Sequence, residues 1–357
     1  MKRVLAMLIA GACALLLGGC SGQGQTPPPE GPDGDDTVYT LIVSSPKNDQ
    51  AEAPFVDWLH NLEELSGGRL QFDIHLSSSL YQQSELISAM NAGMCDIGVL
   101  SLSEESNTFA LNSNIISFPF MGMGYGNDSI YQTLCEEFPE LKAEYDNAGV
   151  MLLDYSYNPP FNLHFTTGQP ITQPSDLNGL KVVTTSDILA AFIAQEGGAP
   201  VSQPITEWYN SLEKGVATGL VAHGANILNF GLIELLEQDV IFGAGSGISV
   251  NLNGYLWSLE SWERLPEDLQ QLILEQVPAF HEANNASQME DAQEADDACA
   301  ANGNLITVLD SDQIAVWREA ASALIDGKID EIEAATGAPV QEMYQRALEL
   351  AAETAGE

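Results

Sequence analysis

The sequence predicts an α/β fold made of two similar lobes, and two observations carry that prediction. Strand-like and helix-like segments alternate over residues 37–100, and the same order of segments returns over residues 181–221. The chain has 357 residues, of which 45% are hydrophobic, so it has enough apolar side chains to fill two ordinary cores.

The first lobe is predicted from a β-α-β-α-β pattern. Its expected elements are a strand at 37–43, a helix at 51–66, a strand at 70–74, a helix at 84–92 and a short apolar strand at 96–100. The glycine pair Gly67-Gly68 ends the first helix and Gly93 ends the second. Because this alternation builds parallel sheets with helices on their faces, ligands are expected beyond the C-terminal ends of the strands.

The second lobe repeats this plan. Its expected elements are a strand at 181–184, a helix at 187–195, a helix at 206–214 and a strand at 216–221. A helix, a glycine stop and a short apolar strand follow one another around Gly215 as they do around Gly93. Two such lobes facing each other across a cleft form a clamp that closes on a small solute.

A long acidic helix is predicted over residues 267–301, where it would run as a spine behind both lobes. Its charges, Glu290, Asp291, Glu294, Asp296 and Asp297 among them, are interpreted as a solvated face. The whole chain has 51 acidic against 11 basic residues and a formal net charge of −40. Such a surface repels phosphate, so we expect no nucleic acid as a partner.

The N-terminus is typical of an exported protein. Lys2 and Arg3 precede a short apolar run, which predicts a signal peptide at residues 1–19. Cys20 follows Leu17-Gly18-Gly19 as in a lipoprotein signal, so we expect it to become the lipid-modified first residue of the mature chain and an anchor to the membrane. Residues 20–36 are rich in Gly, Pro and Gln, as in a flexible tether.

Motifs for catalysis are scarce. The five histidines are scattered, and the sequence has no HExxH, GxSxG or Walker pattern, so we expect neither an enzyme nor a metal or other cofactor. Cys95, Cys135 and Cys299 remain in the mature chain without CxxC spacing, which favours buried free thiols, although one pairing stays open.

Together these residues resemble the solute-binding proteins of TRAP transporters. The first lobe carries Ser66-Gly67-Gly68-Arg69-Leu70, Asp96-Ile97-Gly98-Val99 and Phe118-Pro119-Phe120. The second carries Asp176-Leu177-Asn178-Gly179-Leu180-Lys181 and Glu207-Trp208-Tyr209. The resemblance covers residues 37 to 335 and implies a two-lobed clamp, similar to periplasmic binding proteins and often called a Venus flytrap, with hinge strands and a long C-terminal spine helix.

The resemblance also implies how the lobes divide and what the protein does. One lobe would comprise 37–160 plus 249–290, and the other 161–248 plus 291–357 with the C-terminal helices. A receptor of this family captures a small solute outside the cytoplasm and delivers it to TRAP-type permease subunits, and we expect it to act as a monomer. An ABC-type or sensory ligand-binding lipoprotein is the alternative, and a lipid-anchored hydrolase is a more distant one.

The sequence departs from the family where relatives bind a carboxylate. The family's carboxylate-binding arginine is replaced by Val183, a second common arginine falls at Asn162 or Leu163, and the usual ligand-contacting asparagine becomes Ala222. Burying a carboxylate without a matched cation is costly, so the ligand is expected to be neutral or aromatic. The competing hypothesis is an acid whose charge is met by helix N-terminal amides and by His164 or His223.

The remaining candidate ligand-binding residues follow from strand ends and family positions. In full, the candidates are Ser44, Ser45, Tyr81, Ser101, Ser103, Tyr157, Asn162, His164, Val183, Ile205, Trp208, His223 and Asn226. The sequence does not identify the solute, nor whether the cell has one membrane or two.

Overall fold

The computed structural model describes residues 37–124, 128–243 and 247–355, and the described residues from Val38 onward form one compact unit. The predicted signal peptide at 1–19, the lipid-bearing Cys20 and the tether at 20–36 lie outside the described residues. Within the described part, no helix combines the length and the apolar character that crossing a bilayer requires.

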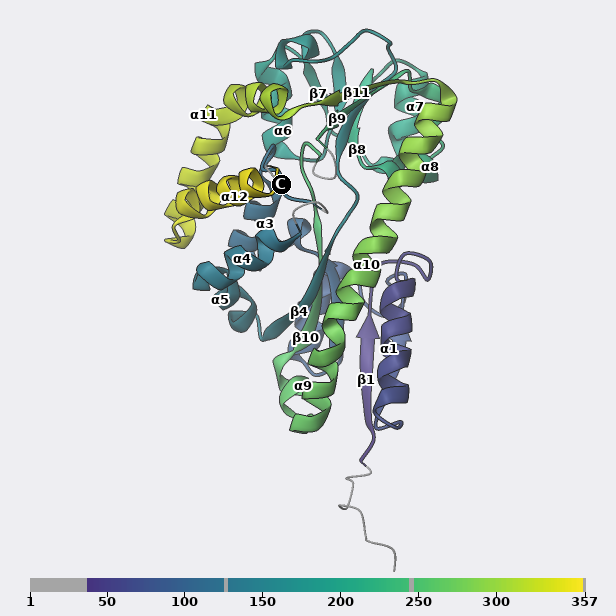
Figure 1. The fold of residues 1–357 in the computed structure, drawn as a ribbon, viewed down its shortest axis with the longest axis vertical. Coiled ribbons are helices and arrows are strands. Elements are labelled where there is room, and N and C mark those ends of the chain that lie inside the picture. The colour runs from purple at the N-terminus through teal and green to yellow at the C-terminus, as the bar shows by residue number, and fades with distance from the viewer. Residues whose placement is uncertain (1–36, 125–127, 244–246, 356–357) are drawn as a thin grey trace, which may run out of the picture. The chain divides into compact units, whose positions relative to one another are not determined.

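The first sheet has five strands in the order β2-β1-β3-β10-β4 (Figure 1). The strands are β1 (Tyr39–Ser44), β2 (Leu70–His75), β3 (Ile97–Ser101), β4 (Val150–Tyr157) and β10 (Leu252–Ser258). The parallel pairing expected from the sequence is confirmed for β1, β2 and β3, whereas β10 runs antiparallel to β3 and to β4. The sheet is therefore mixed. Along the chain, β4 is followed by β5 of the second sheet, and β10 follows β9 of that sheet.

Helices accompany this sheet at the positions the sequence predicts and at several more. They are α1 (Ala53–Leu65), α2 (Gln83–Asn91), η1 (Leu102–Glu104), α3 (Ala110–Ser117), α4 (Ser129–Glu137), α5 (Pro139–Asn147) and α9 (Leu259–Glu263). The predicted helices at 51–66 and 84–92 correspond to α1 and α2 within two residues or so at each end.

The second sheet has six strands in the order β11-β9-β5-β8-β6-β7. The strands are β5 (Asn162–Phe165), β6 (Lys181–Val183), β7 (Ala199–Val201), β8 (Gly219–Ala222), β9 (Gln238–Phe242) and β11 (Leu305–Leu309). The helices between them are η3 (Pro174–Leu177), α6 (Asp187–Gln195), η4 (Ile205–Glu207), α7 (Trp208–Glu213), α8 (Gly224–Asn229) and η5 (Ile233–Leu235). β6 pairs in parallel with β7 and β8, and β5 is antiparallel to β8 and β9.

Three long helices complete the chain. They are α10 (Glu267–Asn302), α11 (Ser311–Thr336) and α12 (Val340–Ala355). α10 contacts α1 and β4 on the side of the first sheet and α8 on the side of the second, as the predicted spine helix should (Figure 1). α11 packs on α3 and α6, and α12 packs on α3 and α4, so the C-terminal helices touch elements that accompany both sheets. The predicted residue boundaries of the two lobes stay a prediction.

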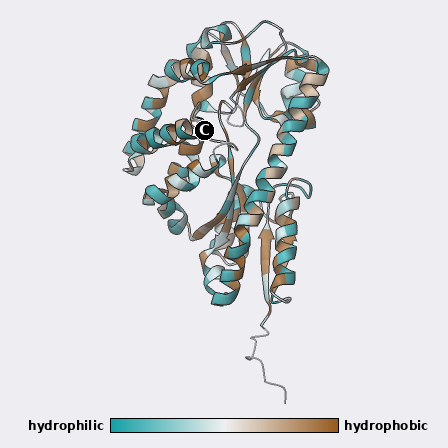
Figure 2. Ribbon diagram, in the orientation of Figure 1, coloured by the Kyte–Doolittle hydropathy of each residue, from teal (hydrophilic) through white to brown (hydrophobic). Residues whose placement is uncertain are grey.

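The apolar residues lie where the strand and helix periodicity places them. Figure 2 shows hydrophobic residues concentrated on the strands and hydrophilic residues over much of α10 and α11. Beneath the first sheet, an aromatic group formed by Phe55, Trp58, Tyr255 and Phe280 joins α1 to β10 and α10. Such clusters dominate the packing energy, because each aromatic side chain removes a large apolar area from water.

Candidate functional site

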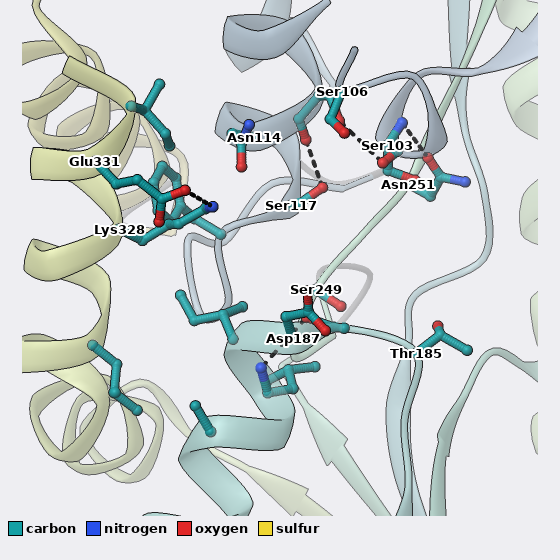
Figure 3. Close-up of a pocket in the computed structure, with 18 of the residues that line it drawn as sticks. Ser103, Ser106, Asn114, Ser117, Thr185, Asp187, Ser249, Asn251, Lys328 and Glu331 are labelled. Carbon is teal, nitrogen blue, oxygen red and sulfur yellow. Dashed lines mark hydrogen bonds and ion pairs between the residues drawn. The ribbon is translucent and has the colours of Figure 1, made fainter. Parts of the chain in front are cut away.

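A cavity of about 1170 Å³ lies where strand ends of the two sheets come together (Figure 3). The first sheet contributes Ser103 after β3, and the second contributes residues 184–187 after β6. The connections between the sheets contribute Phe161 and residues 249–251, and α3 and α11 supply the remaining walls. Its position agrees with the rule that ligands of such sheets bind beyond the C-terminal strand ends.

The α3 wall of the cavity carries hydroxyl and amide side chains, several of which already donate hydrogen bonds to backbone carbonyls. Ser113 Oγ donates to the carbonyl of Ser103 at 3.0 Å, and Ser117 Oγ donates to the carbonyl of Ser113 at 2.6 Å. Asn114 Nδ2 donates to the carbonyl of Ala110 at 2.7 Å. These bonds fix the side chains and leave the oxygens of Ser113, Ser117 and Asn114 free to accept hydrogen bonds from a solute.

Asn251 links the connection between the sheets to the end of β3. Its Nδ2 donates to Ser101 Oγ at 2.7 Å, and its Oδ1 accepts from the backbone N–H of Ser103 at 3.3 Å. Ser101 Oγ also lies 3.4 Å from Ser103 Oγ. Ser101 thus supports the cavity wall from behind, while Ser103 and Asn251 line it.

The wall from the second sheet is the turn between β6 and α6. Ser186 is the N-cap of α6 and accepts from the backbone N–H of Leu189 at 3.4 Å, the usual way to satisfy a free donor in the first turn. The backbone N–H of Ser186 donates to Thr184 Oγ1 at 3.2 Å. Thr185 and Asp187 are exposed and line the cavity (Figure 3).

The charged groups that line the cavity are predominantly acidic. Among the described residues they are Glu104, Asp187, Glu331 and Lys328. Lys328 Nζ lies 3.0 Å from Glu331 Oε1, three residues further along α11, so its charge is already paired (Figure 3). The cavity therefore presents no unpaired cation from its described lining to an anionic solute.

Val183 does not line the cavity. It is fully buried and belongs to an apolar cluster with Trp208, Leu220 and Ala222, against which Ile205 packs. Val183, Ala222 and Trp208 are three positions that the family resemblance singles out, and the structure brings them together in the hydrophobic core and not at the cavity. Thr184, the next residue, is the one that reaches the cavity.

His164 is held by two hydrogen-bonding groups inside the second sheet. Its Nδ1 lies 2.5 Å from Asp239 Oδ1, and its Nε2 lies 3.2 Å from the carbonyl of Ala222. Asp239 Oδ2 also accepts from Asn304 Nδ2 at 2.7 Å. With both ring nitrogens engaged and only 5% of its surface exposed, His164 ties β5 to β8 and β9.

His223 lies next to the cavity but behind its wall. Its ring packs edge-on against Phe161, with 5.0 Å between the ring centroids, and Phe161 lines the cavity. Burial, with the charges of His164 and Lys47 as lesser causes, lowers the pKa of His223 to about 4. His223 is therefore an uncharged imidazole at neutral pH. Its Nδ1 has no hydrogen-bond partner among the described residues.

Lys47 follows β1 and faces the second sheet closely enough for its charge to act on His223. Lys47 Nζ lies 3.6 Å from Glu52 Oε1, an ion-pair distance that is longer than a hydrogen bond. Burial raises the pKa of Glu52, and Lys47 and a hydrogen bond from Ser45 oppose that rise. Lys47 was absent from the sequence-based candidates because only arginines, histidines and helix N-terminal amides were considered there as partners for a carboxylate.

The other candidates from the sequence lie away from the cavity lining. Asn162 Oδ1 accepts from the backbone N–H of Phe242 at 3.1 Å, and Tyr81 Oη donates to the carbonyl of Met94 at 3.4 Å. Ser44, the last residue of β1, and Ser45, which follows it, are fully buried. Tyr157 is fully buried at the end of β4, and Asn226 lies in α8. Of the thirteen sequence-based candidates, only Ser103 lines this cavity.

Several of the lining residues that sequence reasoning missed lie on helices or next to them. Ser106, Asn114 and Ser117 come from α3 or the turn before it, and Lys328 and Glu331 come from α11 (Figure 3). A strand-end rule cannot find them. One signal in the sequence could have indicated a polar helix face. Ser113, Asn114 and Ser117 lie one, three and four residues apart. The same helix carries apolar residues at Leu111, Ile115 and Ile116.

The described residues contain no group of three or more His, Cys, Asp or Glu side chains that could hold a metal ion. Cys95, Cys135 and Cys299 are free thiols, which confirms the expectation of unpaired cysteines. Burial raises the pKa of each of these thiols to about 12, so none is a reactive thiolate at neutral pH.

The chain matches the model of the bacterial extracellular solute-binding proteins, family 7, over residues 42–331. It is similar to the C4-dicarboxylate-binding periplasmic protein DctP of Rhodobacter capsulatus, with 22% identity over 78% of this chain and 82% of the relative. It is also similar to a solute-binding protein of Albidiferax ferrireducens, with 22% identity over 60% of this chain and 62% of the relative, a match that spans less than two thirds of that protein.

Solved structures show the same fold. A TRAP periplasmic solute-binding protein from Ochrobactrum anthropi superimposes with a TM-score of 0.79 and 20% identity, covering 90% of this chain and 98% of that one. A TRAP periplasmic solute-binding protein from Sulfitobacter, with bound β-D-galacturonate, superimposes with a TM-score of 0.68 and 16% identity, covering 87% of this chain and all of that one.

Proposed function

The chain belongs to family 7 of the bacterial extracellular solute-binding proteins, and from this we propose that it captures a small organic solute and delivers it to a TRAP-type membrane permease. It is a receptor and not an enzyme. The cavity formed at the strand ends of both sheets is the observation that carries the proposal, because closing two lobes over such a cavity buries the solute without altering it.

The proposal is tested by finding the solute. Protein purified from its own cells is denatured, and the released small molecules are identified by mass spectrometry. A released organic solute that rebinds the refolded protein in stoichiometric amount supports the receptor function. Chemical conversion of that solute by the purified protein would contradict it. Delivery is tested by uptake of the same solute in membrane vesicles that contain TRAP permease subunits.

We further propose that the mature protein is tethered outside the cytoplasm by a lipid on Cys20. The support is the sequence alone: a basic start, a short apolar run and a small-residue pair before the cysteine. The full chain should partition into detergent after phase separation, and the Cys20→Ala variant should partition into water. Equal partitioning of both forms would contradict the anchor.

The finer proposal concerns the charge of the solute, which we propose to be neutral. Val183 stands where relatives carry the carboxylate-binding arginine, and the charged lining of the cavity is acidic apart from the paired Lys328. The two histidines that could have replaced the arginine do not supply a positive charge to the cavity: His164 is engaged by Asp239, and the pKa of His223 is lowered to about 4.

A neutral solute would distinguish this chain from a structural neighbour that holds a charged one. The Sulfitobacter protein holds β-D-galacturonate, which is an acid. A carboxylate placed in the cavity of this chain would be desolvated beside Glu104, Asp187 or Glu331, at a cost of several kcal/mol without a matched cation. Titration calorimetry with simple dicarboxylates and keto acids tests this point, and tight binding of any of them would refute the neutral solute.

A further inference from the structure

We infer that the solute is a polyhydroxylated neutral molecule, a sugar or a sugar alcohol, recognised mainly by the hydroxyl and amide side chains of α3 and of the turn after β6. This inference rests on the proposed receptor function and narrows it to one class of solute. The observation that carries it is the hydrogen-bonding state of the cavity lining.

The α3 wall and Asn251 offer more hydrogen-bond acceptors than unused donors. Ser113 and Ser117 give their hydroxyl protons to backbone carbonyls, and Asn114 and Asn251 each give one amide hydrogen away. What these side chains have left is mostly oxygen lone pairs. A molecule that carries several O–H groups satisfies such acceptors, whereas a carboxylate has only acceptors of its own.

The charged residues strengthen the same conclusion. Glu104, Asp187 and Glu331 add carboxylate acceptors to the cavity, and hydrogen bonds to ionised acceptors are the stronger ones. Lys328 is held by Glu331 at 3.0 Å. A polyol can donate to these carboxylates and accept from the hydroxyls of Ser106, Thr185 and Ser249, which also line the cavity.

The lining also includes an aromatic side chain, which the C–H groups of a sugar can contact. Phe161 lines the cavity, and its ring is fixed from behind by the edge-on contact with His223. An aromatic ring face carries negative charge density and attracts polarised C–H groups laid against it. The small side chains of Ala110, Ala191 and Ala323 also line the cavity.

The test uses sets of probes that share a carbon skeleton and differ in charge. Neutral hexoses, pentoses and alditols are compared by titration calorimetry with the matching uronic acids, such as glucose with glucuronate, and with the matching amines, such as glucosamine. Benzyl alcohol and benzoate form an aromatic pair. We expect a neutral polyol to bind at least tenfold more tightly than its matched acid, its matched amine and either aromatic compound.

Three variants locate the binding. Ser117→Ala and Asn114→Ala should each weaken binding of that polyol by about three- to tenfold, the effect of one hydrogen bond. Asp187→Asn replaces an ionised acceptor with a neutral one and should also weaken binding of that polyol by about three- to tenfold. Thr133→Ala is the matched control, because Thr133 also donates to the carbonyl four residues earlier in a helix, at 2.9 Å, but does not line the cavity. Each variant's urea midpoint is measured, so that a loss of folding is recognised.

Other outcomes overturn the inference in distinguishable ways. Three results would overturn it and leave the receptor function standing. They are tighter binding of an acid than of its matched polyol, tighter binding of an amine when the Asp187→Asn variant loses that binding, and tighter binding of either aromatic compound. Absence of binding by every probe would also overturn it. The solute identified by mass spectrometry then decides separately whether the receptor function holds, because that measurement depends on no choice of probe.

Discussion

Truncating Val183 to alanine separates a packing role from a binding role at the position where the family resemblance implies an arginine. Val183 is fully buried in the cluster with Trp208, Leu220 and Ala222. The change removes two methyl groups, worth about 1.6 kcal/mol in transfer free energy, and the cavity left behind brings the loss of unfolding free energy to about 2–3 kcal/mol. Solute affinity should change by less than about threefold, because the side chain does not line the cavity.

Urea unfolding followed by tryptophan fluorescence measures the loss, with Val216→Ala as the control. Val216 is 53% exposed, so its truncation should alter the unfolding free energy by less than about 0.5 kcal/mol. Titration calorimetry with the identified solute gives the affinity. The reasoning is refuted if Val183→Ala unfolds like the parent protein and binds its solute more than tenfold differently, because Val183 would then be a contact residue.

Three further predictions follow from buried contacts. The pKa of His223 is lowered to about 4, whereas an unfolded histidine titrates near about 6.5, so the unfolded chain binds a proton first as the pH falls. The free energy of unfolding should therefore decrease between those two pH values. Urea titrations at pH 7 and pH 5 should show a smaller decrease in His223→Gln than in the parent protein. Arg318 donates from Nε and Nη2 to the carbonyl of Phe120 at 2.8 and 2.6 Å, so Arg318→Leu should lower the unfolding free energy by about 2–3 kcal/mol. Arg346→Leu, at exposed ion pairs that water screens, should lower it clearly less, and equal losses would contradict this. A Cβ on Gly219 would press into the Phe165 ring and the His164 carbonyl, so Gly219→Ala should lower the unfolding free energy by about 1–3 kcal/mol. A Cβ on Gly327 in α11 would meet nothing within 4 Å, so Gly327→Ala should raise the unfolding free energy by about 0.5–1 kcal/mol. The thermal midpoints of the two variants should move in opposite directions.

The fold was predictable from the sequence because its signals are local. Apolar alternation in β2 and helical spacing in α1 depend on neighbouring residues, and glycines with positive φ, such as Gly93 and Gly215, end helices by themselves. The strand β7 was missed because Ala199-Pro200-Val201 has too few residues to show a period. The antiparallel pairing of β10 with β3 and β4 was not predictable either, since residues distant in sequence meet there and local patterning does not encode their order.

The candidate site was harder to predict, for the same physical reason. The strand-end rule finds the turns after β3 and β6, and it led to Ser103. It cannot show which residue of a turn points to the cavity: Val183 and Thr184 are neighbours, yet the first is core and the second lines the cavity. Nor can it show that α11, far along the chain, closes the cavity with Lys328 and Glu331.

A cavity whose described lining has no unpaired cation must obtain its binding specificity from other groups. A guanidinium supplies a strong but long-range attraction, which any carboxylate of suitable size can use. Hydroxyls such as Ser113 and Ser117, held to backbone carbonyls of the α3 wall, offer lone pairs in fixed directions and act only over hydrogen-bond distances. A clamp built in this way selects by the positions of the solute's O–H groups rather than by its charge. The strongly negative surface of this chain, which would repel the acids that several relatives bind, is compatible with that mode of recognition.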